Sequence, residues 1–510
     1  MDRRAFLART AALGGGIVLA GCGDDIAAPS PSTSTTTASS TIASTTSAAP
    51  VTTTVPYDPN TPFWLQGGFA PVPAVGPVTE LEVVGSLPPT LNGLFTRNGS
   101  NPASGDSPHW FFGDGMVHGM RLENGSASWY ANRHVDTPFL RDGRAFGEFV
   151  APPGTAETQA NVSMLVHGDR LFSLGEVGWP YEIDPTDLST IGPTDVTGPA
   201  GSLGPNVTAH PKVDPATGLL HFFGYGFTPP YLTYYVASAD GRDLLVKEEI
   251  PMGAGTMIHD FAITETDVIF WEFPVVFDLT AAAAGAVNPF TWDAAYGSRI
   301  GVMPLGGPTS ELRWVEIENG YVFHGTNAFR QGDTVVVDVS RIDSIFDASV
   351  PGGNDLNANA PELIRWEIGT GGDELTWKAE ARSDLALEFP EIDHRWTGRP
   401  HSVAWYTETF DTPDGNLEFP AVTRLDVASG ATDRWESGDL RQPGETVFVP
   451  DSPDAAEGEG WLLTFVWDKT TDRSSFAVLD ATDVGAGPVA EVLLPQRVPF
   501  GFHGAWMPDT

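Results

Sequence analysis

Short runs rich in Val, Phe, Tyr, Trp and Leu alternate with turns rich in Gly, Pro, Asp and Asn over most of this chain. Runs of this kind, too short for helices and enriched in β-branched and aromatic residues, are typical of β-strands. The chain holds 56 glycines and 43 prolines, which supply the turns that closely spaced strands need. The pattern predicts an all-β protein.

Three segments show the hairpin pattern most clearly. In each, two apolar runs flank a short, mainly polar stretch, the arrangement of two antiparallel strands joined by a turn. The predicted strand pairs are 232–236 with 244–246, 421–427 with 434–435, and 461–467 with 475–479. Hairpins at this density occur in sandwiches, barrels and propellers. Because the chain shows no crisp repeat, periodicity does not choose among these folds.

The first 55 residues break the pattern. The segment from Asp2 to Leu7, DRRAFL, resembles a twin-arginine export signal, and the apolar stretch that follows is too short to span a bilayer, which needs about 20 residues. It ends in LAGC, which resembles a lipoprotein cleavage box with Cys22 at the acceptor position. We predict a twin-arginine lipoprotein signal peptide over residues 1–21 and lipid on Cys22. A stray cysteine in an ordinary secretory signal is the alternative.

A low-complexity segment follows this signal. Residues 29–54 are almost entirely Ser, Thr, Ala and Pro, and such a segment cannot bury enough apolar surface to offset its ordering entropy. We predict a disordered tether over residues 22–55 and one globular domain over residues 56–510. Cys22 is the only cysteine, so no intramolecular disulfide can form.

The chain is strongly acidic. Its net charge is −39, and removing residues 1–21, with three Arg and one Asp, makes it −41. This charge argues against nucleic-acid binding, which selects basic patches, and against electrostatic adhesion to anionic lipid. Membrane proximity would come instead from lipid on Cys22. The predicted location is the outer face of the cytoplasmic membrane.

Four of the 11 histidines lie in apolar or turn segments far apart in the chain: TAHPKVDP, MIHDFAIT, VFHGTNAF and PFGFHGAW. Four neutral imidazoles can hold a divalent metal with no thiolate and no carboxylate, and imidazole suits iron, zinc, copper and nickel. Spacing alone does not establish such a site, because a single histidine in an apolar segment is more often a hydrogen-bonded core residue. The candidate ligands are His210, His259, His324 and His503.

The segments around these histidines resemble those of the carotenoid cleavage oxygenase family, which includes the retinal pigment epithelial membrane protein. The resemblance runs in the family's order from about Phe63 to Trp506. Besides the four histidine segments it includes NGLFTRNGSNP, HWFFGDGMVHGMRLENG, NRHVDTP, LGEVGWPYEIDP, GRPHSVAWY, GETVFVPDSP and GWLLTFVWD. Several ligand motifs in one order are far more specific than one short pattern.

This resemblance implies a seven-bladed β-propeller with Fe²⁺ on its axis, bound by the four histidines. Seven blades would use roughly 65 residues each, more than the ~40–50 of compact propeller repeats. The surplus would form loops that cap the active-site face, and AAAAGAVNP, residues 281–289, is expected to form one short helix there. Export of a folded protein would allow iron to be inserted before export.

The resemblance also places three glutamates behind the ligands. Metal-bound histidines usually donate their second N–H to a carboxylate or carbonyl, which fixes the tautomer and the ring orientation. The family pattern assigns this role to Glu176, Glu388 and Glu445, with Glu391 as a competitor for Glu388. The sequence does not show which glutamate serves which histidine. We interpret the remaining histidines, among them His109 and His118, as structural.

The implied function is that of a non-haem iron dioxygenase. It would insert O2 across a C=C bond of a carotenoid or apocarotenoid and release two carbonyl products. The metal and O2 would carry the difficult chemistry, so no acid–base pair is required. The protein would bind a long, apolar, conjugated molecule and set which bond lies over the iron.

Lysine content bears on the substrate. One branch of the family cleaves phenolic stilbenes and uses a lysine soon after an NRxVxT segment. Here that segment is followed by PFLRDGR, and no lysine occurs between Met120 and Lys212. This favours carotenoids, with a stilbene- or phenylpropene-cleaving oxygenase as the alternative. A lipid-anchored propeller that binds carotenoid without cleaving it is the alternative outside the enzymes, and the four intact histidine motifs argue against it.

Two departures from the family pattern stand out. Many members have proline where this chain has Ser100, in RNGSNP, which is a loop change that we expect to be tolerated. Many carry an acidic residue where this chain has Arg330, six residues after His324. We therefore expect the electrostatics near His324 to differ.

Overall fold

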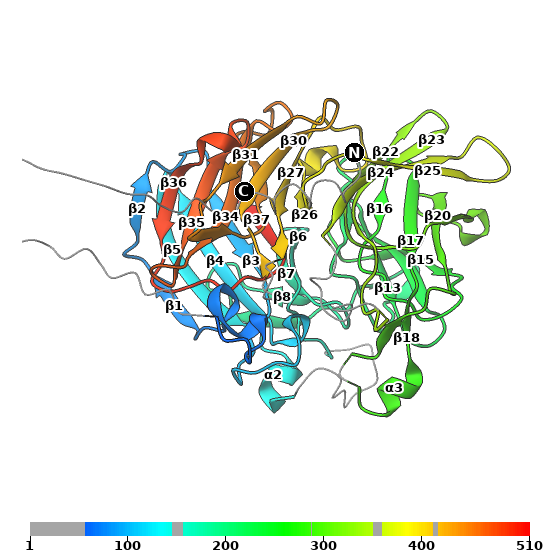
Figure 1. Cartoon of the computed structure of the whole chain (residues 1–510), viewed down its shortest axis with the longest axis horizontal. Helices are drawn as coiled ribbons and strands as arrows, with labels where there is room; N and C mark the ends of the chain where they lie inside the picture. The colour runs from blue at the N-terminus through cyan, green and yellow to red at the C-terminus, as the bar shows by residue number, and fades with distance from the viewer. Residues whose placement is uncertain (1–56, 145–156, 287, 350–359, 412–416, 510) are drawn as a thin grey trace, which may run out of the picture. The chain divides into compact units, whose positions relative to one another are not determined.

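The computed structural model describes residues 57–144, 157–286, 288–349, 360–411 and 417–509 (Figure 1). Contacts group residues 53–510 into one compact unit. The predicted signal peptide, Cys22 and the whole predicted tether lie outside the described residues, so the domain boundaries stay predictions. Within the described ranges, no helix is long and apolar enough to cross a membrane.

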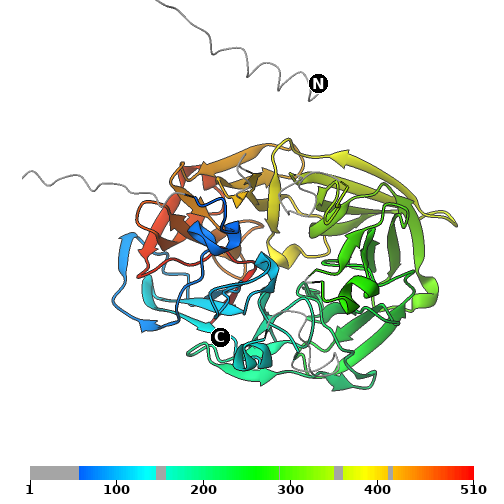
Figure 2. The same ribbon diagram turned by 60° about the horizontal axis from the view of Figure 1, so that its bottom comes forward.

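Seven antiparallel sheets of four or more strands, which we call blades, follow one another around a ring in the described part of the chain (Figures 1 and 2). Their strands are short, rich in β-branched and aromatic residues, and separated by glycine-containing turns, as the apolar pattern predicts. The predicted seven-bladed β-propeller is confirmed.

Five blades are each built from one continuous part of the chain. Their strands, blade by blade, are β6 (Ser163–His167), β7 (Arg170–Leu174), β8 (Tyr181–Ile183) and β9 (Thr190–Pro193); β12 (Lys212–Val213), β13 (Leu220–Tyr225), β14 (Leu232–Ala237) and β15 (Leu244–Ile250); β16 (Ala262–Ile263), β17 (Asp267–Glu272), β20 (Ser298–Pro304) and β21 (Arg313–Ile317); β22 (Tyr321–Gln331), β23 (Thr334–Ile342), β24 (Glu362–Gly369) and β25 (Thr376–Ala381); and β26 (Leu387–Glu391), β27 (Val403–Glu408), β30 (Ala421–Asp426) and β31 (Thr432–Glu436).

Two blades combine strands from both ends of the domain and so close the ring. One consists of β1 (Val75–Val78), β3 (Gly93–Arg97), β4 (Met116–Glu123), β5 (Ser126–His134) and β37 (Gly504–Pro508). The other consists of β2 (Glu82–Gly85), β32 (Arg441–Pro443), β33 (Val447–Pro450), β34 (Gly460–Asp468), β35 (Arg473–Asp480) and β36 (Pro488–Leu493). The closing pairs are β3 with β37, where Phe95 faces Trp506, and β2 with β36, where Val83 faces Val492.

The three predicted hairpins are present as β14–β15, β30–β31 and β34–β35. Three two-stranded excursions interrupt the regular blades: β10 (Thr197–Gly198) with β11 (Gly201–Ser202), β18 (Val275–Phe277) with β19 (Phe290–Trp292), and β28 (Phe410–Asp411) with β29 (Leu417–Glu418). These insertions differ in length and position, which explains why the sequence shows no crisp repeat.

Two short α-helices, α2 (Pro138–Asp142) and α3 (Leu279–Ala283), lie on the same side of the propeller (Figure 1). The predicted helix over residues 281–289 was placed too late and made too long. It begins at Leu279 because the Asp278 side chain accepts hydrogen bonds from the N–H groups of Thr280 and Ala281. Gly285, at a φ of +83°, turns the chain away after it.

The described residues also contain short 3₁₀ turns: η1 (Phe63–Leu65), η2 (Gly67–Phe69), η3 (Trp110–Phe112), η4 (Thr309–Glu311), η6 (His394–Trp396) and η7 (Val484–Ala486).

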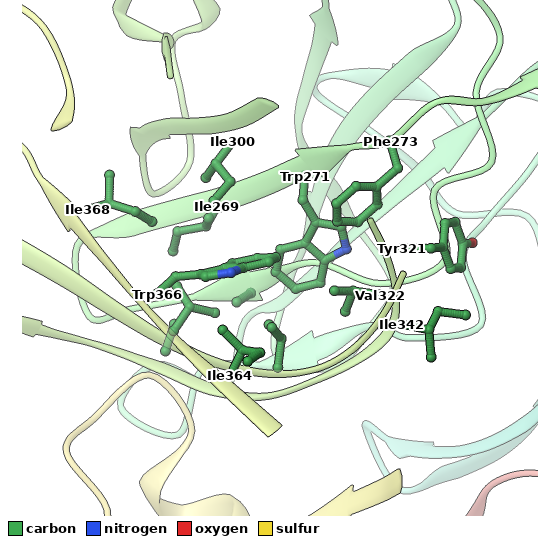
Figure 3. Close-up of a cluster of buried hydrophobic side chains, with 14 of the residues drawn as sticks. Ile269, Trp271, Phe273, Ile300, Tyr321, Val322, Ile342, Ile364, Trp366 and Ile368 are labelled. Atoms are coloured by element: carbon green, nitrogen blue, oxygen red, sulfur yellow. The ribbon is translucent and has the colours of Figure 1, made fainter. Parts of the chain in front are cut away.

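The core lies between neighbouring blades. Figure 3 shows the cluster between the β16–β21 blade and the β22–β25 blade, in which the rings of Trp271 and Trp366 meet edge to face with centroids 5.9 Å apart. Isoleucines from both blades, including Ile269 and Ile364, surround this pair (Figure 3). Full burial of such side chains contributes about 1.5–3 kcal/mol each. The packed blades form a rigid frame, so side chains that reach the axis are held at fixed positions.

Candidate metal centre

Every blade provides one of the seven predicted site residues. Four blades carry the histidines: His210 shortly before β12, His259 shortly before β16, His324 within β22 and His503 directly before β37. The other three carry the glutamates: Glu176 after β7, Glu388 in β26 and Glu445 between β32 and β33. Residues that lie far apart in the sequence therefore meet at one point.

The four histidines form a compact cluster of ring nitrogens, in which one nitrogen from each lies within 4.8 Å of the others. Nε2 of His210 lies 2.9 Å from Nε2 of His259, and Nε2 of His324 lies 3.1 Å from Nε2 of His503. Two nitrogens bound at right angles to an ion at about 2.1 Å would lie about 3.0 Å apart, whereas tetrahedral ligands would lie about 3.4 Å apart. Both spacings would allow one ion to contact the two nitrogens of each pair.

Glutamates set the tautomer of two of these rings. Nδ1 of His324 lies 2.6 Å from Oε2 of Glu388, and Nδ1 of His503 lies 2.6 Å from Oε1 of Glu445. A carboxylate accepts, so Nδ1 of each ring donates and each Nε2 keeps a lone pair. The lone pairs of His324 and His503 then face one another with no proton between them, an arrangement that a cation between them would stabilise.

Burial favours the neutral form of two of these imidazoles, those of His210 and His324. It lowers the pKa of His210 and of His324 well below the ordinary histidine value, and the neighbouring imidazoles lower both further. A metal ligand must be the neutral form of histidine. For His259, burial lowers the pKa, but the carboxylates of Glu176, Asp260 and Glu388 together more than offset this, so its pKa is raised.

The contact between Glu176 and His259 differs from the other two. Oε2 of Glu176 lies 3.0 Å from Nδ1 of His259, at an angle too oblique for a hydrogen bond, and Oε1 accepts from the hydroxyl of Tyr225 at 3.2 Å. Glu176 reaches past the intervening blade, which carries His210, to meet His259. Among the described residues, His210 has no carboxylate partner, and its backbone N–H donates to Oγ1 of Thr208 at 3.1 Å.

The structure separates Glu388 from its competitor Glu391. Oε1 of Glu391 accepts the backbone N–H of Phe448 at 2.7 Å, and its Oε2 lies 3.4 Å from Nε2 of His394, so it does not contact a clustered histidine. A register shift lies between Glu388 and Glu391, and Phe389 has a φ of +48°, which is unusual for a bulky residue. This bulge turns Glu388 toward the axis.

The remaining histidines in the described residues have local partners. His118 contacts the hydroxyl of Tyr130, and His221 contacts the hydroxyl of Tyr234. Nδ1 of His109 accepts the N–H of Phe111 and caps η3, and burial lowers the pKa of His109 to about 4, which keeps it an acceptor. Partners also exist for His134, His167, His394 and His401. None of these histidines joins the cluster.

A cavity of about 690 Å³ opens onto the cluster and includes His259, His324 and His503 in its wall. That size lies within the about 300–1,000 Å³ of small-molecule sites. Aromatic side chains lie in three parts of the lining: Trp110, Phe111 and Phe112 from η3, Phe227, Phe277 and Phe290 near α3, and Phe323, Phe389 and Phe502 beside the histidines. The site therefore combines a metal-type nitrogen cluster with an apolar chamber.

Comparison with known proteins places this site in a family. The sequence profile of the retinal pigment epithelial membrane protein family matches residues 69–508. The chain belongs to this family, that of the carotenoid cleavage oxygenases. It is 34% identical to carotenoid 9,10(9',10')-cleavage dioxygenase 1 of Pisum sativum over 507 residues, which cover 89% of this chain and 91% of the relative.

Two further relatives broaden the comparison. The chain is 32% identical to isoeugenol monooxygenase of Pseudomonas nitroreducens, covering 87% of this chain and 98% of the relative. The crystal structure of lignostilbene dioxygenase of Pseudomonas brassicacearum matches with a TM-score of 0.78 at 29% identity, covering 89% of this chain and all of that one. This member of the carotenoid cleavage oxygenase family is thus an oxygenase.

Arg330, which departs from the family pattern, points away from the cluster in this oxygenase. It makes a bidentate pair with Asp267, at 2.8 Å from Nε to Oδ2 and 2.5 Å from Nη2 to Oδ1, and its Nη1 donates to Thr370. The charge of Arg330 is therefore paired with Asp267 at the end of β22 away from His324, so the expected change in electrostatics does not reach the cluster directly.

Sequence reasoning missed two parts of this oxygenase site. It interpreted His109 as structural and assigned no role to Trp110, Phe111 and Phe112, which follow it and line the cavity. An aromatic run next to glycines was the available signal. It also assigned no role to Lys212 or Asp260, whose side chains pair directly behind the cluster at 2.7 Å. No local pattern shows that pairing, because the two residues lie on different blades.

Proposed function

We propose that this protein is an iron(II) oxygenase that cleaves a C=C bond of a carotenoid or apocarotenoid with O2 and releases two carbonyl products. The observation that carries the proposal is that the histidine cluster opens, through His259, His324 and His503, into a large, mainly apolar cavity. The relatedness to a carotenoid cleavage dioxygenase supports it.

The four histidines His210, His259, His324 and His503 would hold the iron. Neutral ligands leave the charge of a ferrous ion uncompensated, and imidazole is a suitable ligand for iron. When bound, iron supplies the binding and activation of O2. Everything else in the reaction depends on how the protein holds the substrate and the ligands.

The protein's own contributions are orientation and exclusion of water. Glu388 and Glu445 hold the rings of His324 and His503 by their Nδ1 atoms, so each Nε2 points to the axis. Phe323 and Phe389 lie against these ligands, with the Phe323 ring centroid 5.2 Å from that of His259 and the Phe389 ring 5.6 Å from His324. An apolar polyene would lie between such rings and shield the reacting bond from water.

The cavity lining favours an apolar substrate over a phenol. Among the described residues that line the cavity, none is lysine or arginine, and the one tyrosine, Tyr225, donates its hydroxyl to Glu176. The sequences of the three longer gaps inside the domain, 145–156, 350–359 and 412–416, contain no lysine either. A basic group that would activate a phenol is therefore missing from the described wall.

Cleavage of a phenylpropene or stilbene is the second candidate. It is favoured by the similarity to isoeugenol monooxygenase and to lignostilbene dioxygenase. Aerobic incubation of the iron-loaded protein with a β-apocarotenal, isoeugenol and a hydroxystilbene, followed by mass spectrometry of the carbonyl products, tests both. We expect aldehydes from the apocarotenal. Products from the phenols alone would establish the second candidate instead.

We also propose that the protein is exported and anchored by lipid on Cys22, with the apolar side of the cavity mouth against the bilayer. Leu279 is 61% exposed on α3, whose Ala282 lines the cavity, and Phe410 is 54% exposed next to Thr409, which also lines it. Two large apolar side chains beside an apolar opening support contact with lipid, where a carotenoid would be dissolved.

A further inference from the structure

Asp260 is a buried carboxylate directly behind the histidine cluster. It follows His259 in the sequence, is only 1% exposed, and contacts no imidazole in the described structure. Its role must therefore differ from that of the three glutamates, which contact the Nδ1 atoms of the rings.

Its two oxygens bind three chain segments. Oδ1 lies 2.7 Å from Nζ of Lys212 and accepts the N–H of Phe261 at 2.8 Å, and Oδ2 accepts the N–H of Gly325 at 2.9 Å. Lys212 lies two residues after His210, Asp260 is adjacent to His259, and Gly325 is adjacent to His324. One carboxylate thus connects the segments that carry three of the four candidate ligands.

The contact with Gly325 falls where β22 departs from regular pairing. Register shifts lie on both sides of Gly325, so His324 sits in a bulge that turns its side chain toward the axis. A side chain at position 325 would meet the ring of Trp271 at 2.9 Å, which leaves glycine as the residue that fits there. Asp260 satisfies the N–H of this glycine and so holds the bulge in place.

The ion pair between Asp260 and Lys212 stabilises this connection between the three segments. Removing one partner of a buried pair leaves an uncompensated charge and an unsatisfied donor, and the backbone must move to compensate. The fourth ligand segment is held separately, because the N–H of Gly504 donates to Oε2 of Glu445 at 2.7 Å. A loss at Asp260 would therefore shift His210, His259 and His324 relative to a fixed His503.

We propose that Asp260 is a positioning residue for the metal centre, which with Lys212 sets the spacing of the three ligand-bearing backbones. This inference rests on the proposed metal-binding function. It differs from the role of the glutamates, since those fix the orientation of single rings, whereas Asp260 fixes the distances between rings on three blades.

Cobalt(II) binding to the full-length metal-free protein tests the proposal without turnover. The dissociation constant is measured by competition with a chelator under nitrogen, and the visible absorption of the bound ion reports the ligand geometry. The variants are Asp260→Asn, which keeps shape and one acceptor oxygen, Lys212→Met, which keeps the aliphatic stem, and Lys212→Arg, which keeps the charge. Asp393→Asn is the matched control, because Asp393 is also 1% exposed, pairs with Arg395 at 2.6 Å and accepts a backbone N–H.

We expect Asp260→Asn to weaken cobalt binding about 10-fold or more, the range found for partners outside the ligand shell, and to change the absorption spectrum. Lys212→Met should also weaken cobalt binding and change the absorption spectrum, and Lys212→Arg should stay closer to wild type in both. Asp393→Asn should lower the unfolding temperature of the metal-free protein and leave cobalt affinity and spectrum unchanged.

Wild-type cobalt affinity and spectrum in Asp260→Asn would overturn the proposal, even if that variant is less stable. If Asp260→Asn does not fold, Lys212→Met decides in the same way. Failure of the wild-type protein to bind cobalt(II) or iron(II) would instead remove the proposed metal function itself, so the two failures are distinct.

Discussion

Nδ1 of His324 lies 2.6 Å from Oε2 of Glu388, and the two residues come from adjacent blades. The contact fixes the imidazole with Nε2 toward the axis, although the ring and the carboxylate belong to separately packed sheets. The site therefore depends on how neighbouring blades are docked, as well as on the residues themselves.

Glu388→Gln should lower metal affinity about 10–100-fold, since the amide keeps the size of the side chain but loses the charge that stabilises the Nδ1–H tautomer. Iron content after dialysis against a graded chelator series measures this. Glu391→Gln is the matched control, because it lies on the same strand and contacts Phe448 instead. A loss of iron in the control with none in Glu388→Gln would show that the two roles are reversed.

His324→Ala should remove most of the iron and the activity, because His324 provides one of the four clustered nitrogens. Metal analysis of the purified variant and turnover of a β-apocarotenal measure the two effects. His401→Ala, at a buried histidine that contacts Asn327, should keep its iron. Full iron and full turnover in His324→Ala would contradict its assignment as a ligand.

How far the sequence predicts this site varies from residue to residue. The histidines were predictable because each lies in a short segment with a distinctive flank, such as MIHDFAIT around His259. The preference for Glu388 over Glu391 rested on the family pattern alone, since the geometry behind it depends on a bulge and a positive φ at Phe389 that no local pattern shows. Which glutamate meets which histidine was also hidden, because Glu176 reaches past a whole blade to His259.

The fold was likewise predictable from the sequence only in part. Hairpins such as β34–β35 follow from apolar runs and turn residues, which act locally. The number of blades followed only from the family resemblance, because the two-stranded excursions and the ring closure by β2 and β37 obscure any repeat. Contacts between distant segments, such as Lys212 with Asp260, are fixed by blade packing and leave no trace in spacing.

The pair between Arg330 and Asp267 predicts a pH-dependent contribution to stability. Burial raises the pKa of Asp267, but hydrogen bonds from Arg330 and from two threonines more than offset this, so the pKa is lowered from 3.8. A carboxyl with a lowered folded-state pKa stabilises the fold above its unfolded value, and that contribution disappears as the pH falls through the folded value.

Arg330→Met should therefore lower the free energy of unfolding at pH 7 by up to about 3 kcal/mol. This is the low end of the cost of breaking a buried ion pair, because Arg330 is partly exposed. Urea unfolding from pH 7 to pH 2 measures this, and the stabilities of the variant and the wild type should approach one another as the pH falls below 3.8 through the lowered pKa of Asp267. Iron content should not change. A difference that is constant across this range would show that the ion pair is not its cause.

The stacked rings of Phe227 and Phe277, with centroids 4.1 Å apart, should contribute to binding rather than to the chemical step. Phe277→Ala should raise KM for a long polyene by about 10-fold or more, in line with the roughly 1.5–3 kcal/mol of a buried apolar side chain, with little change in kcat. Steady-state kinetics on a detergent-dispersed apocarotenal measure both values. A fall in kcat at constant KM would place this ring next to the reacting bond instead.

Leu279 and Phe410 should bring the cavity mouth to the bilayer once lipid on Cys22 holds the protein nearby. Acidic charge opposes electrostatic adhesion to anionic lipid, so contact must come from apolar side chains and the anchor. Cys22→Ser should release the protein into the soluble exported fraction and leave turnover of detergent-dispersed substrate unchanged.

The double variant Leu279→Ser, Phe410→Ser should keep the protein anchored but slow turnover of a carotenoid dissolved in vesicles, with detergent-dispersed turnover as the control. Unprocessed wild-type protein in the cytoplasm would contradict the anchor, and equal rates on vesicles for the double variant would contradict the contact.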